Sequence, residues 1–73
     1  MTKISFEIPI QSEIKIILYD ITGQEIKTIV NQKYDAGFHS VILNADELSS
    51  GVYLYRMITS SGYTAVKKLI IIK

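Results

Sequence analysis

The most informative stretch for the architecture is residues 48–57, which read Leu48-Ser49-Ser50-Gly51-Val52-Tyr53-Leu54-Tyr55-Arg56-Met57. From position 52 onward, a Val, Leu and Arg set alternates with a Tyr, Tyr and Met set, which predicts a strand over 52–59. A Leu and a Gly shortly before a Tyr at a strand start are the setting of a tyrosine corner. In such a corner the ring is buried and its hydroxyl bonds to the backbone a few residues upstream. Because tyrosine corners belong to Greek-key sandwiches, this stretch predicts that architecture.

The rest of the chain alternates in the same way. Further strands are predicted over 3–10, 13–20, 24–30, 37–43 and 63–73, with turns at 20–23 and 60–62 that each end in Gly. Residues 31–37 are expected to form a polar loop that leads into the next strand at Gly37, and residues 44–47 have the spacing of one capped helical turn. Strands at this spacing predict an all-β fold, an immunoglobulin-like Greek-key antiparallel β-sandwich of six to seven strands forming a single domain over residues 1–73.

The predicted core follows from the alternation. Within each strand, the set of side chains that is consistently apolar or aromatic is assigned to the inner face. These inward side chains are Phe6, Ile8, Ile14, Ile16, Leu18, Ile26, Val41, Leu43, Tyr53, Tyr55 and Met57.

Composition excludes several classes of protein. The chain has 73 residues, of which 48% are hydrophobic and 21% are charged, so it is globular rather than disordered. It contains no Cys, which excludes disulfides and thiolate metal sites. The formal net charge of +1 gives no general reason to expect nucleic acid or a membrane surface as a partner. The longest aliphatic run, residues 69–72, is far shorter than the ~20 residues that cross a bilayer.

The charges are unevenly distributed along the chain. All seven acidic residues lie in residues 1–47, whereas residues 48–73 carry Arg56, Lys67, Lys68 and Lys73 with no acid. One interpretation is that these lysines are solvated and protect an exposed sheet edge. The alternative is that a partner recognises a basic C-terminal strand.

No residue pattern indicates catalysis. His39 is the single imidazole and, at an alternating strand position, reads as a partly buried structural residue. Asp46 and Glu47 are adjacent and point different ways, and the Asp20–Gly23 turn lacks the spaced acids of a calcium loop. We therefore expect no catalytic residue, metal site, cofactor or small-molecule substrate. The tyrosines could form an aromatic platform for a sugar or a single strand of nucleic acid, although core packing explains them more simply: Tyr19, Tyr34, Tyr53, Tyr55 and Tyr63.

Five segments, taken in order, resemble a known family. They are Ile4-Ser5-Phe6-Glu7-Ile8-Pro9, Ile16-Ile17-Leu18-Tyr19-Asp20-Ile21-Thr22-Gly23, Ala36-Gly37-Phe38-His39, residues 48–57 and Lys67-Lys68-Leu69-Ile70-Ile71-Ile72-Lys73. The set resembles the C-terminal sorting domain of the type IX (Por) secretion system. It is also similar to the related immunoglobulin-like domain of flagellar hook-capping proteins. The structural positions that carry the resemblance are Tyr19, Asp20, Gly23, Gly37, Gly51 and Tyr53.

The resemblance implies a non-enzymatic sorting signal on a secreted cargo protein of a Gram-negative bacterium. Its implied partners are an N-terminal cargo domain and translocon proteins of the outer membrane, with no nucleic acid and either a monomer or an edge-strand dimer. The cargo would pass through the periplasm to the outside or to the cell surface. The family's last strand is the part most tied to recognition, which corresponds here to Lys67, Lys68, Leu69, Ile70, Ile71, Ile72 and Lys73.

Two departures from the family pattern leave an alternative open. Family members usually carry an Asn-Pro-rich stretch before the first strand, which is absent here, so the sequence is expected to start a few residues inside the domain. The fourth strand often ends in Trp, where this chain has Leu43. The alternative function is a structural or assembly module of the hook-cap type, or an accessory domain of an enzyme.

Overall fold

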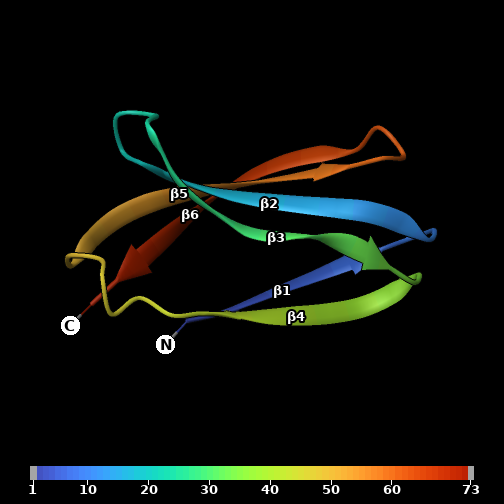
Figure 1. Cartoon of the computed structure of the whole chain (residues 1–73), viewed down its shortest axis with the longest axis horizontal. Helices are drawn as coiled ribbons and strands as arrows, with labels where there is room; N and C mark the ends of the chain where they lie inside the picture. The colour runs from blue at the N-terminus through green and yellow to red at the C-terminus, as the bar shows by residue number, and fades with distance from the viewer. Residues whose placement is uncertain (1, 73) are drawn as a thin grey trace.

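The computed structural model describes residues 2–72, which form six strands and, within that range, no helix. The strands are β1 (Thr2–Ile8), β2 (Ser12–Asp20), β3 (Glu25–Tyr34), β4 (Gly37–Leu43), β5 (Gly51–Thr59) and β6 (Thr64–Ile71). All pairings are antiparallel, and they give a two-stranded sheet, β1-β4, and a four-stranded sheet, β3-β2-β5-β6. Figure 1 shows that β1 begins and β6 ends at the same end of the molecule. The all-β sandwich predicted from the sequence is confirmed.

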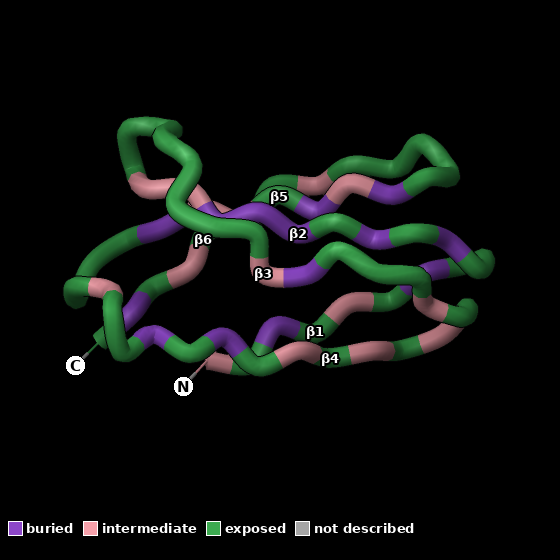
Figure 2. The backbone as a smooth tube through the Cα atoms, viewed as in Figure 1, coloured by how far each residue is buried: buried purple, intermediate pink, exposed green. Residues whose placement is uncertain are grey.

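The core lies between the two sheets. In Figure 2 the buried positions are most frequent on β2, with others on β1 and β5, while most of the connections are exposed. Most of the predicted inward set is buried, and Phe6, Val41 and Tyr55 pack half-buried against it. The predicted inward set lacks several residues that the structure buries: Ile4, Ile17, Val30, Ala45 and Ile71.

The prediction that Ile26 points inward is wrong, because its side chain is 37% exposed. The pairing of β2 with β3 shifts register twice, between Ile16 and Ile17 and between Leu18 and Tyr19. Each shift inserts an extra residue into the ladder and bends the strand, so the period of two fails across β3. Counting alternate positions from Ile26 therefore gives the wrong face.

Two predicted connections also differ from the structure. The expected polar loop at 31–37 is largely strand, because β3 continues to Tyr34 and pairs with the start of β2. The expected helical turn at 44–47 is instead a hydrogen-bonded turn in which Leu48 N–H donates to the Ala45 carbonyl at 3.0 Å. The Asn44 side chain accepts from Asp46 N–H at 3.0 Å, so it satisfies the local backbone without starting a helix.

The tyrosine corner is present. The Tyr53 hydroxyl donates to the carbonyl oxygen of Ser49 at 2.7 Å, and the ring is buried at the start of β5. This bond ties the connection from β4 to the strand at the centre of the larger sheet. The sequence motif at residues 48–53 therefore fixes where the chain crosses from the small sheet to the large one.

Candidate functional site

The candidate recognition segment is β6, which lies at an edge of the four-stranded sheet and pairs only with β5. A tight hairpin places it there. Gly62 has a φ of +96°, a conformation that side chains rarely adopt, and its N–H donates to the Thr59 carbonyl at 3.1 Å. Thr59 N–H in turn donates to the Tyr63 carbonyl at 2.9 Å, and its hydroxyl accepts from Tyr63 N–H at 3.0 Å. The hairpin turn predicted from residues 60–62 is confirmed.

The two central lysines of β6 point to opposite faces of the sheet. Lys67 pairs with Tyr55 and belongs to the inner face, whereas Lys68 pairs with Leu54 and belongs to the outer face. Both side chains are exposed, and neither forms an ion pair with any residue in the described range 2–72. The structure therefore does not bring the two cations to one surface, although both lie on the same edge strand.

The aliphatic tail is divided in the same way. Ile71 is 4% exposed and belongs to the core, and Leu69 packs half-buried against that core. Ile70 and Ile72 are 57% and 86% exposed. Lys73, the last residue of the predicted segment, lies outside the described residues.

The outer edge of β6 has a row of backbone groups that no other strand of the described chain pairs with. The register of β5 and β6 is uninterrupted from the Gly51–Ile71 pair to the Ile58–Thr64 pair. The hydrogen bond from Thr59 N–H to the Tyr63 carbonyl shows which residues of β6 direct their backbone groups toward β5. Residues in antiparallel strands turn their backbone groups alternately toward and away from the neighbour. The N–H and C=O groups of alternate residues therefore face outward, those of Thr64, Val66, Lys68 and Ile70.

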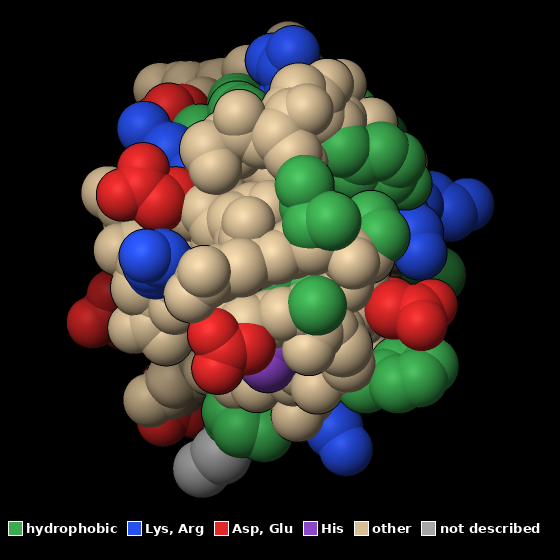
Figure 3. All heavy atoms as spheres, turned by 90° about the vertical axis from the view of Figure 1, so that its right-hand side faces the viewer, with side chains coloured by type: hydrophobic (Ala, Val, Ile, Leu, Met, Phe, Trp, Pro, Cys, Tyr) green, Lys and Arg blue, Asp and Glu red, His purple; other side chains and the backbone are tan. Residues whose placement is uncertain are grey.

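Surface charge elsewhere is mixed. Figure 3 shows one end of the molecule, where acidic and basic side chains are interspersed and no large area carries a single sign. Asp20, in the β2–β3 turn, accepts hydrogen bonds at Oδ1 from the Thr22 hydroxyl and from the N–H groups of Gln24 and Thr22. These bonds, led by that of the Thr22 hydroxyl, lower the pKa of the Asp20 carboxyl below its ordinary value of 3.8. Asp20 is thus a structural residue of the turn.

The residues considered for chemistry do not assemble into a reactive site. The ring of His39 lies between aromatic neighbours, with centroids 4.7 Å from Tyr34 and 5.7 Å from Phe6, and its Nε2 is 2.6 Å from the Asp35 carbonyl oxygen. A carbonyl only accepts, so Nε2 carries the proton in this contact. Within residues 2–72, no group of three His, Cys, Asp or Glu side chains could hold a metal ion. The described range also contains no helix that could span a membrane.

The tyrosines do not form a common platform. Tyr53 and Tyr55 face the core, Tyr34 packs against Phe6 at a centroid distance of 5.2 Å, and Tyr63 is exposed beside the β5–β6 turn. Tyr19 pairs with Leu54 and so belongs to the opposite face of the large sheet from Tyr55. The simpler interpretation of these residues, as packing and surface residues of the sandwich, fits the structure.

Sequence reasoning did not find the groove that opens between β1 and β6. Its lining includes Glu7 and Ala65, which no motif marks. No local signal could have found it, because the groove follows from the unequal numbers of strands in the two sheets.

Comparison with known proteins gives one match. A family model described as the secretion system C-terminal sorting domain covers residues 1–72. No curated protein and no solved structure matches the chain. The match spans nearly all of the sequence and includes the five segments that carry the resemblance. The chain therefore belongs to the family of secretion system C-terminal sorting domains, the non-catalytic tails that direct cargo proteins into type IX secretion and out to the cell surface or beyond.

Proposed function

We propose that β6 is the strand through which the secretion machinery recognises this domain, with Lys67 and Lys68 as its charged contacts. The observation that carries the proposal is the edge position of β6, with both lysines exposed and without ion-pair partners among the described residues. A strand added at this edge would bond to the outward backbone groups of β6. Acidic side chains on that strand would meet a lysine on either face, which gives the contact a charge preference.

The same proposal divides the tail by role. Leu69 and Ile71 hold β6 on the domain through the core, while Ile70 and Ile72 remain exposed for a partner. Lys73 joins the recognition segment on the strength of the family resemblance. The hydrophobic and the basic parts of the tail thus serve folding and recognition together.

In this scheme the cargo first reaches the periplasm through its own signal peptide. The outer-membrane translocon then engages the folded domain at β6 and passes the cargo outward. The domain itself performs no catalysis and requires no cofactor. Its contribution is an exposed strand edge that a partner can extend.

The test is a charge reversal that leaves the fold intact. A reporter with a signal peptide is fused ahead of the domain and produced in a bacterium that has type IX secretion. We expect Lys67→Glu with Lys68→Glu to leave the melting temperature nearly unchanged, because both side chains are exposed. The reporter should then accumulate in the periplasm instead of the medium.

The opposite edge of the same sheet provides a matched control. Lys27 and Lys33 are exposed on β3, so Lys27→Glu with Lys33→Glu makes the same change in net charge at another edge strand. Export should be retained in this control. Undiminished export of the folded β6 variant, or equal loss in both double variants, would contradict recognition at β6.

A further inference from the structure

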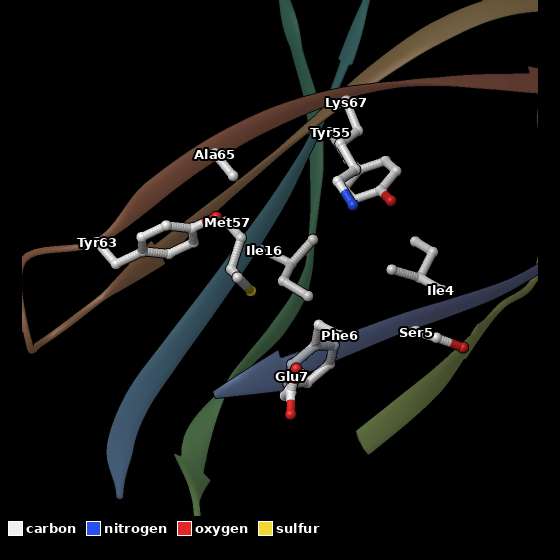
Figure 4. A pocket seen from close by; sticks show the side chains of 10 residues that line it. All are labelled: Ile4, Ser5, Phe6, Glu7, Ile16, Tyr55, Met57, Tyr63, Ala65 and Lys67. Carbon is white, nitrogen blue, oxygen red and sulfur yellow. The ribbon is translucent and has the colours of Figure 1, made fainter. Parts of the chain in front are cut away.

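A groove runs between the free edges of the two sheets. It has a volume of about 220 Å³ and lies between β1 on one side and β5 and β6 on the other. Figure 4 shows Ile4 and Phe6 of β1 and, across from them, Tyr55 and Met57 of β5 pointing into this space, while Ser5 and Glu7 point away from it. Its walls are mostly apolar, and Glu7 and Lys67 are the charged residues of its lining. The apolar lining includes Ile4, Phe6, Tyr55, Met57 and Ala65.

The groove exists because the sheets differ in width. On the β6 side, Ala65 and Lys67 line the groove with no strand of the smaller sheet opposite them in the described part. Among the described residues, β1 pairs with β4 along one edge only, so its other edge, which borders the groove, has no strand partner there. A strand laid beside β1 would bond to this edge and place its inward side chains against β5 and β6.

The space suits one strand better than a second copy of the domain. Antiparallel pairing of two β1 strands in one sheet places both sandwiches on the same side of that sheet. Each copy would then bring its own β6 over the other's groove, and the two overhanging strands would compete for the same volume. An extended segment without a second layer has no such conflict.

The charges on β1 specify the order of charges on the incoming strand. Lys3 and Glu7 are exposed on its outer face, on either side of Ser5, and neither forms an ion pair among residues 2–72. Their neighbours on β4 are uncharged, since Lys3 pairs with Ile42 and Glu7 pairs with Phe38. An antiparallel strand meets Glu7 first and Lys3 four residues later. Opposite charges at directly facing positions are favourable, so a basic residue followed four positions on by an acidic one fits this edge.

We propose that the groove between β1 and β6 binds an extended segment of another polypeptide, paired antiparallel with β1. On its outer face the segment carries a basic residue and, four positions later, an acidic one. Its inward-facing side chains are small and apolar, because they would contact Met57 and Ala65. The segment pairs with β1 and not with the outer edge of β6, although Lys67 borders both places. The proposal does not depend on the export role proposed for β6.

The probe is a synthetic peptide, acetyl-Thr-Lys-Val-Ser-Val-Glu-Val-amide, titrated into the isotopically labelled 73-residue chain. In the proposed register its Lys faces Glu7, its Glu faces Lys3, and two of its valines enter the groove. Amide shifts should move in β1 and at Ala65 and Lys67, and should saturate. The matched control peptide exchanges Lys and Glu and has the same composition. It should bind roughly five- to thirtyfold more weakly, as expected for two reversed cross-strand pairs.

Two variants distinguish charge-specific pairing with β1 from nonspecific hydrophobic binding. Lys3→Glu with Glu7→Lys reverses the pattern on exposed positions and should exchange the preference, so that the control peptide now binds better. Ala65→Leu fills the groove without touching those charges and should weaken both peptides at least fivefold. Melting curves check that each variant is folded.

Several outcomes would overturn the site. Failure of both peptides to shift any β1 amide would do so, as would shifts confined to the outer edge of β6. A preference that stays the same in the charge-reversed variant would show that pairing with β1 is not the mode of binding. Dimerisation of the domain on addition of peptide, without saturable shifts at Ala65, would indicate that the free edge of β1 pairs with a second copy of the domain instead.

Discussion

At the scale of single residues, Tyr53 ties the fold together through one hydroxyl. Tyr53→Phe keeps the ring in place but leaves the Ser49 carbonyl without its 2.7 Å donor. We expect a loss of about 1–3 kcal/mol in the free energy of unfolding, the usual result when a buried hydrogen bond loses one partner. Chemical denaturation measures this loss. Tyr63→Phe is the control, because it removes the same hydroxyl group from an exposed tyrosine. Equal midpoints for the two variants would contradict the corner.

The stability of the β2–β3 turn should depend on pH through the carboxyl group of Asp20. Its three hydrogen bonds, led by the one from the Thr22 hydroxyl, hold the folded-state pKa below the ordinary 3.8. The ionised Asp20 carboxylate therefore stabilises the folded state fully above pH 3.8. This contribution is lost as the pH falls through the lower pKa of the folded state. Asp20→Asn should be less stable than the parent at neutral pH, and the difference in stability should narrow as the pH falls below the ordinary carboxyl value. Urea midpoints across this range test it, and a gap that does not change with pH would rule out the carboxylate as its cause.

At the scale of elements, alternation predicts the strands well and fails where pairing is irregular. The five strands other than β3 were placed within about two residues, because their side chains keep a period of two. In β3, Ile29 and Val30 are adjacent and the ladder shifts twice, so neither the face of Ile26 nor the end of the strand could be read from the sequence. Backbone pairing to β2 extends β3 through residues 31–34 regardless of their polar side chains.

Two adjacent isoleucines near the end of the chain should behave differently. Ile71 is 4% exposed and belongs to the core, whereas Ile72 is 86% exposed. Ile71→Ala should cost about 2–5 kcal/mol in the free energy of unfolding, and Ile72→Ala should cost almost nothing. Thermal and urea unfolding of the two variants compare the same chemical change one residue apart. Similar losses would mean that β6 is not packed on the core as the structure has it.

At the scale of the whole molecule, the family and the candidate edge could be predicted, but the groove could not. The order of the segments from Ile4 to the Lys67-Lys68 tail indicated the family. The hairpin turn at residues 60–62 indicated that the basic residues lie on the last strand. The position of a strand in a sheet depends on pairing between segments that are far apart in the sequence. Here β4 pairs with β1 in the smaller sheet and not with a strand of the larger one. The lysines marked β6 as an edge strand, but no local pattern marks the partner of β1, so the free edge of β1 is seen only in the fold.

The fold as a whole, rather than the last strand alone, should be what the secretion machinery engages. Ile16 is fully buried between the sheets and far in sequence from β6, so Ile16→Ala leaves residues 64–72 unchanged. It should cost about 2–5 kcal/mol, a large part of the stability of so small a domain, whereas Ile16→Val should cost only about 0.5–1.5 kcal/mol. If the machinery binds folded β6 at the sheet edge, reporter export should fall with the folded fraction, strongly for Ala and slightly for Val. Circular dichroism gives that fraction for each purified domain. Export of the Ala variant at the parent level, with its domain shown to be unfolded, would mean that the tail is recognised as a linear sequence.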